Sequence, residues 1–90
     1  MSGPFPLGQI LATPGAIERM ERLGIAHVEL LGRHISGDWG TVDPEDAAAN
    51  ELAVREGLRI LSSYGTDDDR LWVITEADRS ATTILRPEDY

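Results

Sequence analysis

Residues 58–90, LRILSSYGTDDDRLWVITEADRSATTILRPEDY, decide the fold of this 90-residue chain. Three short runs within it, 58–64, 71–75 and 82–85, have the apolar content and the two-residue alternation that are typical of β-strands. The polar connections between them are short, which favours an antiparallel β-meander. We expect the middle strand, 71–75, to be central because it is apolar on both faces.

The residues before the meander predict three helices. Thr13 and Pro14 place a hydroxyl at an N-cap and a proline at the first helical position, so a helix should run from there to about residue 23. Apolar residues at helical spacing predict a second helix over 26–36. A third, over 44–56, should begin after Asp43. The sequence therefore predicts an α+β fold, three helices followed by a three-stranded antiparallel meander.

The remaining residues complete the predicted architecture. Residues 1–6 contain two prolines and a glycine and are expected to form a flexible N-terminal arm. Residues 7–12 are compatible with a short additional strand, and the whole chain, 1–90, should form a single domain. One face of the sheet, or its exposed edge strand, would then be open to self-pairing or to a partner.

The charge balance indicates which partners the chain suits. Sixteen acidic residues stand against eight basic ones, all of them arginine, so the net charge is −8. Such a chain is repelled by phosphate backbones, and we expect no direct binding to nucleic acid. A protein partner with a basic surface fits better, although ordinary solubility also explains the charge. No segment approaches the ~20 apolar residues of a membrane span, so we expect a cytoplasmic protein without membrane contact.

The residue patterns that mark many enzymes are absent. The chain has no cysteine, which excludes disulfides, thiolate metal sites and thiol catalysis. It also lacks the glycine-rich phosphate loops, the His-Glu-x-x-His zinc motif and the Gly-x-Ser-x-Gly nucleophile motif. The three carboxylates at 67–69 do not have EF-hand spacing and should form a solvated turn. We therefore predict no catalytic residue, no cofactor and no metal.

Residues 33–40 form the first candidate site. His34, Asp38 and Trp39 follow one another closely there, and a His and an Asp near a helix end are suited to binding or general-base chemistry. The alternative is structural: His34 would complement the helix dipole, Asp38 would bond to backbone in the turn, and Trp39 would cover the edge of the core.

The turn at 76–80, Glu-Ala-Asp-Arg-Ser, forms the second candidate site. If the turn is exposed, Glu76 and Asp78 offer a carboxylate pair, and Arg79 offers a guanidinium fork, to the charges of a partner. The alternative is a loop satisfied internally, in which Arg79 pairs with one of its own carboxylates. The turn is longer than a two-residue hairpin requires, which singles it out among the loops of the chain.

The segments 36–40 and 72–85 resemble a family of small bacterial proteins that are often encoded on plasmids and integrated elements. Some members carry the label of a type I restriction endonuclease subunit M. An adenine methyltransferase would be expected to have an Asn/Asp-Pro-Pro-aromatic loop, whereas the nearest segment here, 43–46, is Asp-Pro-Glu-Asp. The resemblance implies a protein of a mobile element that is associated with defence systems, without implying that activity.

Together these features predict a non-enzymatic acidic binding protein of a mobile element, of the anti-restriction or anti-CRISPR type, that inhibits a host nucleic-acid-processing complex. One alternative is a small enzyme that resembles ribonuclease toxins and uses His34, Arg59, Tyr64 and Arg79. Another is a structural or regulatory homodimer. The expected partner-binding residues are Asp38, Trp39, Glu76, Asp78 and Arg79. His34 and Arg59 are secondary candidates.

Overall fold

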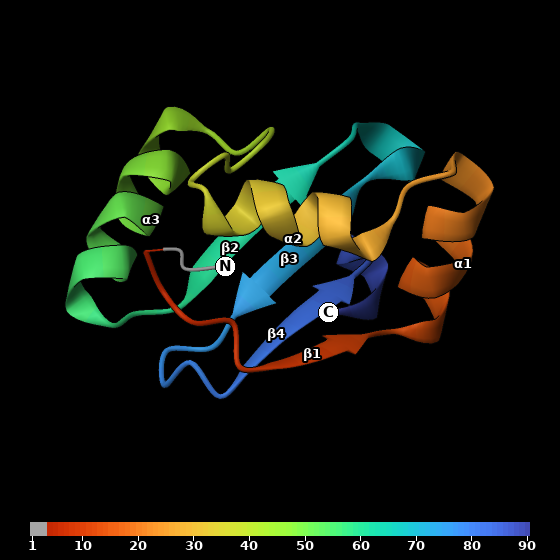
Figure 1. The fold of residues 1–90 in the computed structure, drawn as a ribbon. Coiled ribbons are helices and arrows are strands. Elements are labelled where there is room, and N and C mark those ends of the chain that lie inside the picture. The colour runs from red at the N-terminus through yellow and green to blue at the C-terminus, as the bar shows by residue number, and fades with distance from the viewer. Residues whose placement is uncertain (1–3) are drawn as a thin grey trace.

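A four-stranded mixed sheet forms the centre of the structure, which is a computed structural model that describes residues 4–90 (Figure 1). The predicted antiparallel meander is confirmed, and a fourth strand lies parallel to its last strand. In spatial order the strands are β1 (Gln9–Ala12), β4 (Ala81–Leu85), β3 (Leu71–Thr75) and β2 (Ile60–Tyr64).

The predicted three-stranded meander is only part of the sheet, because the short strand considered for residues 7–12 forms as β1 and pairs with β4. Gln9 lies opposite Ala81, so β1 pairs with a strand at the other end of the chain. Short connections, residues 65–70 and 76–80, join the meander strands, and local alternation is therefore enough to predict their pairing. A parallel pair needs a long crossover connection, here the three helices and two strands, and its pairing leaves no local signal in the sequence. The strand predicted to be central, β3, is an interior strand, and β4 is the other one.

The three predicted helices are confirmed as α1 (Pro14–Leu23), α2 (His27–Ile35) and α3 (Pro44–Glu56). The hydroxyl of Thr13 accepts a hydrogen bond from the backbone N–H of Ala16, as expected of an N-cap. Within residues 4–90, no helix has the length and the apolar character that crossing a bilayer would require.

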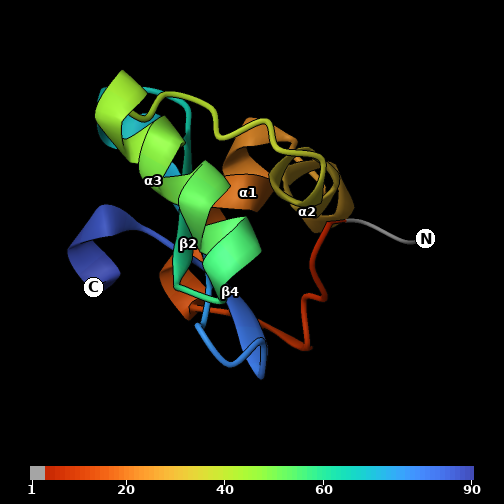
Figure 2. The same cartoon turned by 90° about the vertical axis from the view of Figure 1, so that its left-hand side faces the viewer.

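Helix α2 and the C-terminal residues lie on opposite faces of the sheet. In Figure 1, α2 crosses in front of the strands, with α1 and α3 at the two ends. Figure 2 shows α2 on one side of the sheet and the C-terminal 3-10 turn, η2 (Pro87–Asp89), on the other. Beyond η2, the ring of Tyr90 packs edge-to-face against Trp72 with 5.8 Å between centroids. The larger core cluster between sheet, α1 and α2 contains Ala16, Met20, Leu30, Leu31, Tyr64, Leu71, Val73 and Ile84.

The N-terminal segment contributes to a second core cluster, together with Trp39, Ala53 and Ile60. Phe5, within the segment expected to be a flexible arm, is only 4% exposed. Its ring stacks on Trp39 with 6.5 Å between centroids. Residues 1–3 of that expected arm lie outside the described residues. Phe5 is therefore part of the core, and it closes the end of the sheet beside α3.

Candidate functional site

The β3–β4 turn is held rigidly by the side chain of Arg79. The backbone of Arg79 is left-handed, with φ of 60°, and its guanidinium turns inward. It donates hydrogen bonds to the carbonyl oxygens of Leu58 at 2.6 Å, Ala53 at 2.9 Å and Glu76 at 3.1 Å. The guanidinium of Arg79 is thus hydrogen-bonded to backbone carbonyls at the end of α3 and just before β2. Among the residues that the structure describes, it forms no ion pair with a carboxylate.

Glu76 and Asp78 are consequently left as exposed carboxylates on a fixed turn. Neither belongs to an ion pair within residues 4–90. The backbone N–H of Ser80 donates to Asp78 Oδ1 at 3.0 Å, and bonds from the hydroxyl and the N–H of Ser80 hold the pKa of Asp78 below its usual range. Because the pKa of Asp78 is lowered, this carboxylate stays ionised over the physiological pH range. The turn therefore presents negative charge to solvent from a defined position.

A shallow groove of about 250 Å³ adjoins the turn on the sheet face opposite α2. Glu76 lines one part of it, and Tyr90 another. The guanidinium of Arg59 lies 5.0 Å from the centre of the Tyr90 ring, a cation–π distance. Ile74, Thr83 and Leu85 complete the lining. The groove thus has an apolar floor, one carboxylate (Glu76) and one guanidinium (Arg59), and a basic side chain can lay its aliphatic stem on the floor with its charged head toward Glu76.

Asp38 and Trp39 are engaged in internal contacts. Arg33 Nε donates to Asp38 Oδ2 at 2.7 Å, and this bond lowers the pKa of the carboxyl. Trp39 is 6% exposed, and its Nε1 donates to Glu51 at 2.9 Å. Trp39 is thus part of the core, and Asp38 is already paired with a cation.

The structure does not bring the five predicted partner-binding residues together. The hydroxyl of Tyr64, at the end of β2, donates to the carbonyl oxygen of Asp38 at 2.7 Å. Glu76 follows Thr75, which lies opposite Ile60 at the other end of β2. Asp38 therefore lies at one end of the sheet, and the β3–β4 turn at the other. The turn and its groove form the candidate site.

The side chain of His34 forms no hydrogen bond with that of Asp38. Its side chain is fully buried beneath Phe5 and Trp39, with ring centroids 5.4 Å and 6.0 Å away. Nδ1 lies 2.6 Å from the hydroxyl of Ser62, and Nε2 lies 2.9 Å from that of Thr75. Burial lowers the pKa of His34 to about 4, because a buried site disfavours the charged imidazolium. His34 is therefore neutral at pH 7.

A chain of hydrogen bonds assigns the tautomer of His34. The carbonyl oxygen of Leu7 only accepts, so the hydroxyl of Thr82, 2.7 Å away, must donate to it. The Thr82 oxygen then accepts from the Thr75 hydroxyl at 2.7 Å, and the Thr75 oxygen accepts from Nε2–H of His34. Nδ1 is left without a proton and accepts from Ser62. Every member of the chain is satisfied in the neutral state.

The residues of the ribonuclease-like alternative do not converge. His34 is buried on the α2 side of the sheet, whereas Arg59 lines the groove on the opposite face. Tyr64 is also buried, and burial raises the pKa of its hydroxyl to about 12. Arg79 is bound to carbonyls at the turn. Among residues 4–90, no group of histidines and carboxylates is arranged to hold a metal ion.

Two features were missed by reasoning from the sequence. One is Asn50, a buried residue of α3 whose amide bonds to the backbone of Leu61. The other is the row of hydroxyls that satisfies His34. Ser62, Thr75 and Thr82 all lie on strand faces where aliphatic residues are expected, and that pattern was the available signal for a buried polar partner.

The chain matches no protein-family model, no curated protein and no solved structure in the comparisons made. The resemblance of segments 36–40 and 72–85 to mobile-element proteins therefore stays a prediction.

Proposed function

We propose that this chain is a non-enzymatic acidic binding protein whose partner is a protein with a basic surface. The binding surface is the β3–β4 turn with its adjoining groove. Glu76 and Asp78 supply the charge, Arg79 holds the turn in place, and Arg59 forms part of the groove.

One observation carries the proposal: the only cation of the turn is used internally. Arg79 donates to three carbonyl oxygens, and neither of the two carboxylates beside it forms an ion pair within residues 4–90. Four other arginines, by contrast, are paired with carboxylates elsewhere: Arg19, Arg22, Arg33 and Arg86. Asp78 is already held by its bond from Ser80, so this carboxylate loses little entropy when it binds a guanidinium or ammonium group.

The resemblance to mobile-element proteins suggests the class of partner. A host complex of the restriction or CRISPR type holds nucleic acid in a positively charged channel. A small protein of net charge −8 is attracted to such a channel, and this attraction would also speed the encounter. By occupying the channel, the protein would act as an inhibitor of nucleic-acid processing.

The test measures binding of immobilised protein to purified restriction and CRISPR-type effector complexes, free of nucleic acid, at low and high salt. We expect binding at low salt that weakens as salt rises. The double variant Glu76→Gln, Asp78→Asn should raise Kd about tenfold, corresponding to ~1.4 kcal/mol for two lost charges.

The matched control is Asp67→Asn, Asp68→Asn, which removes the same charge from an exposed turn at the other end of β3. This control should bind like the wild type. Equal weakening by both double variants would show that only net charge matters and would overturn the assignment of the turn. Failure to bind any complex at low salt would overturn the proposed function.

A further inference from the structure

The two edges of the sheet differ in whether their outward-facing backbone groups have hydrogen-bond partners within the chain. At the β2 edge, the Asn50 side chain accepts from the backbone N–H of Leu61 at 3.1 Å and donates to its carbonyl at 2.7 Å. Further along β2, the N–H of Ser63 donates to the backbone carbonyl oxygen of Trp39 at 3.0 Å, and the N–H of Thr41 donates to the carbonyl oxygen of Ser63. The outward-facing backbone groups of Leu61 and Ser63 are thereby satisfied within the chain.

Gly40 allows this closure of the β2 edge. It has a φ of 75° and forms a bridge with Ser63. A Cβ atom at position 40 would collide with the carbonyl oxygen of Ser63. The loop approaches β2 so closely that only glycine fits, and the β2 edge is therefore protected against pairing with another strand.

The β1 edge, in contrast, is open. In the parallel β1–β4 pair, the N–H of Gln9 donates to the carbonyl oxygen of Ser80, the residue before β4. The N–H of Thr13 donates to the carbonyl oxygen of Ile84 in β4, and both bonds are 3.0 Å long. Alternate residues of a strand bond to the same neighbour, so the N–H and C=O groups of Ile10 and Ala12 point away from β4. Because β1 ends the sheet, these groups lie at its unpaired edge.

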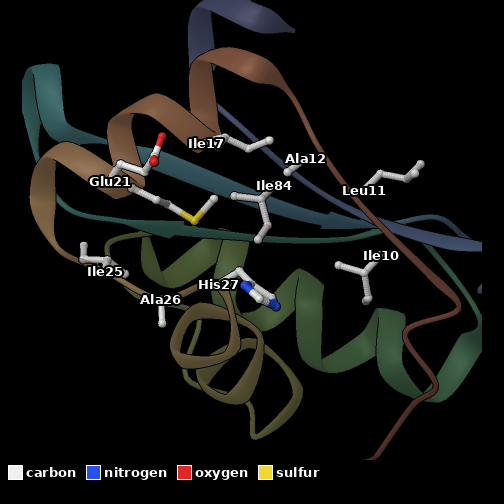
Figure 3. Close-up of a pocket in the computed structure, with 10 residues that line it drawn as sticks. Ile10, Leu11, Ala12, Ile17, Glu21, Ile25, Ala26, His27 and Ile84 are labelled. Atoms are coloured by element: carbon white, nitrogen blue, oxygen red, sulfur yellow. The ribbon is translucent and has the colours of Figure 1, made fainter.

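An apolar surface lies beside this open edge. A groove of about 320 Å³ runs between β1, α1 and the start of α2, with Ile84 at its base (Figure 3). Ile10, Leu11 and Ile17 line it and are 42%, 42% and 46% exposed. Such exposed aliphatic residues beside an unpaired strand are typical of a protein interface. Glu21 and His27 are the ionisable residues of the groove.

The distribution of charge indicates what covers this edge. All sixteen acidic and all eight basic residues lie at 18–90, so the first 17 residues carry no charged side chain. This groove offers a basic partner a single carboxylate, that of Glu21, and therefore little electrostatic attraction. A second copy of the chain, although it also carries −8, can approach this neutral edge with little repulsion.

We propose that β1 pairs antiparallel with β1 of a second copy about a two-fold axis perpendicular to the sheet. Ile10 of each copy then lies opposite Ile10 of the other, and each donates its N–H to the other's carbonyl, as in an isologous interface. Both copies keep their helices on the same side of one continuous eight-stranded sheet. The exposed side chains of Ile10 and Ile17 are covered where the two grooves meet. This inference is independent of the proposed function.

The test is the molar mass of the protein in solution, measured by sedimentation equilibrium over a range of concentrations. The wild type is expected at twice the mass of the chain. Ile10→Lys should raise the dissociation constant of the dimer at least tenfold, since it places like charges opposite each other at the axis. The control is Leu52→Lys, which changes a similarly exposed aliphatic residue on α3 at the far side of the sheet, and it should remain dimeric.

Amide hydrogen exchange tests the pairing itself, with circular dichroism to confirm that each variant is folded. Exchange at Ile10 and Ala12 should slow as the wild type dimerises, whereas Leu11, already bonded to β4, should change little. A monomeric wild type would overturn the proposal. So would an Ile10→Lys variant that dimerises like the wild type, or a dimer in which exchange at Ile10 and Ala12 stays fast.

Discussion

Lowering the pH from 7 to 5 is expected to reduce the free energy of unfolding by about 2 kcal/mol through His34 alone, given its folded pKa of about 4. In the unfolded chain, His34 titrates near its ordinary value of 6.5. Between these two pKa values the unfolded state binds the proton and the folded state does not. The contribution of neutral His34 to the free energy of unfolding is therefore fully present above pH 6.5. It decreases as the pH falls and levels off below about pH 4.

The physical cause is the buried hydrogen-bond chain. Neutral His34 donates from Nε2 to Thr75 and accepts at Nδ1 from Ser62. A proton on Nδ1 would place a second donor against Ser62 and a full charge among Phe5, Trp39 and aliphatic residues, where solvation is lost. By pH 4 the accumulated loss should be about 3 kcal/mol.

Urea unfolding at several pH values measures this effect. His34→Gln should be less stable at pH 7 but should lose this pH dependence between pH 5 and 7. His27→Gln, which changes the exposed histidine at the start of α2, should retain it. Nitrogen chemical shifts of His34 report the tautomer directly, even if the Gln variant does not fold. A His34 that titrates near pH 6.5 in the folded wild type would contradict this account.

Truncation of Trp39 is expected to be the most damaging single substitution. Trp39→Ala should lower the free energy of unfolding by about 3–5 kcal/mol, the range for large aromatic residues in cores. The side chain is 6% exposed, stacks on Phe5 and packs against His34. Its removal would leave a cavity beside α3 and remove the hydrogen bond to Glu51, whose exposed carboxylate would then bond to water.

The second tryptophan provides the matched control. Trp72 is half-buried on the sheet face opposite α2, where Tyr90 covers it in part. Trp72→Ala should therefore cost clearly less than Trp39→Ala. Trp39→Phe should keep most of the packing and lose the bond to Glu51, at a cost of about 1 kcal/mol for the hydrogen bond. Equal losses for both alanine variants in denaturant unfolding would show that Trp39 is not a core residue.

Local signals explain why most of the fold was predictable. The meander is encoded by alternation within 58–85, and the helix at Pro14 by its cap. The strand β1 was missed as a member of the sheet because its pairing depends on β4, far away in sequence. Four residues, three of them apolar in succession, carry too little pattern to fix such a partner.

The candidate site was predictable only in part. The β3–β4 turn was singled out by its length and charge, but the sequence left open whether Arg79 pairs with a carboxylate. The answer depends on tertiary structure, because the carbonyls of Ala53 and Leu58 reach Arg79 only after α3 has packed. The sequence left open whether His34 serves in a binding site or complements the helix dipole, and its burial likewise follows from Phe5 folding back over it.

The most direct test of the central claim is a competition measurement on an effector complex that the protein binds. The amount of nucleic acid held by the complex is followed while wild-type protein or the Glu76→Gln, Asp78→Asn variant is added. If the carboxylates of the turn dock in the nucleic-acid channel, the wild type displaces the nucleic acid, and the variant needs about tenfold more protein for the same displacement. A complex that holds nucleic acid and this protein together, with neither weakening the other, would contradict the account.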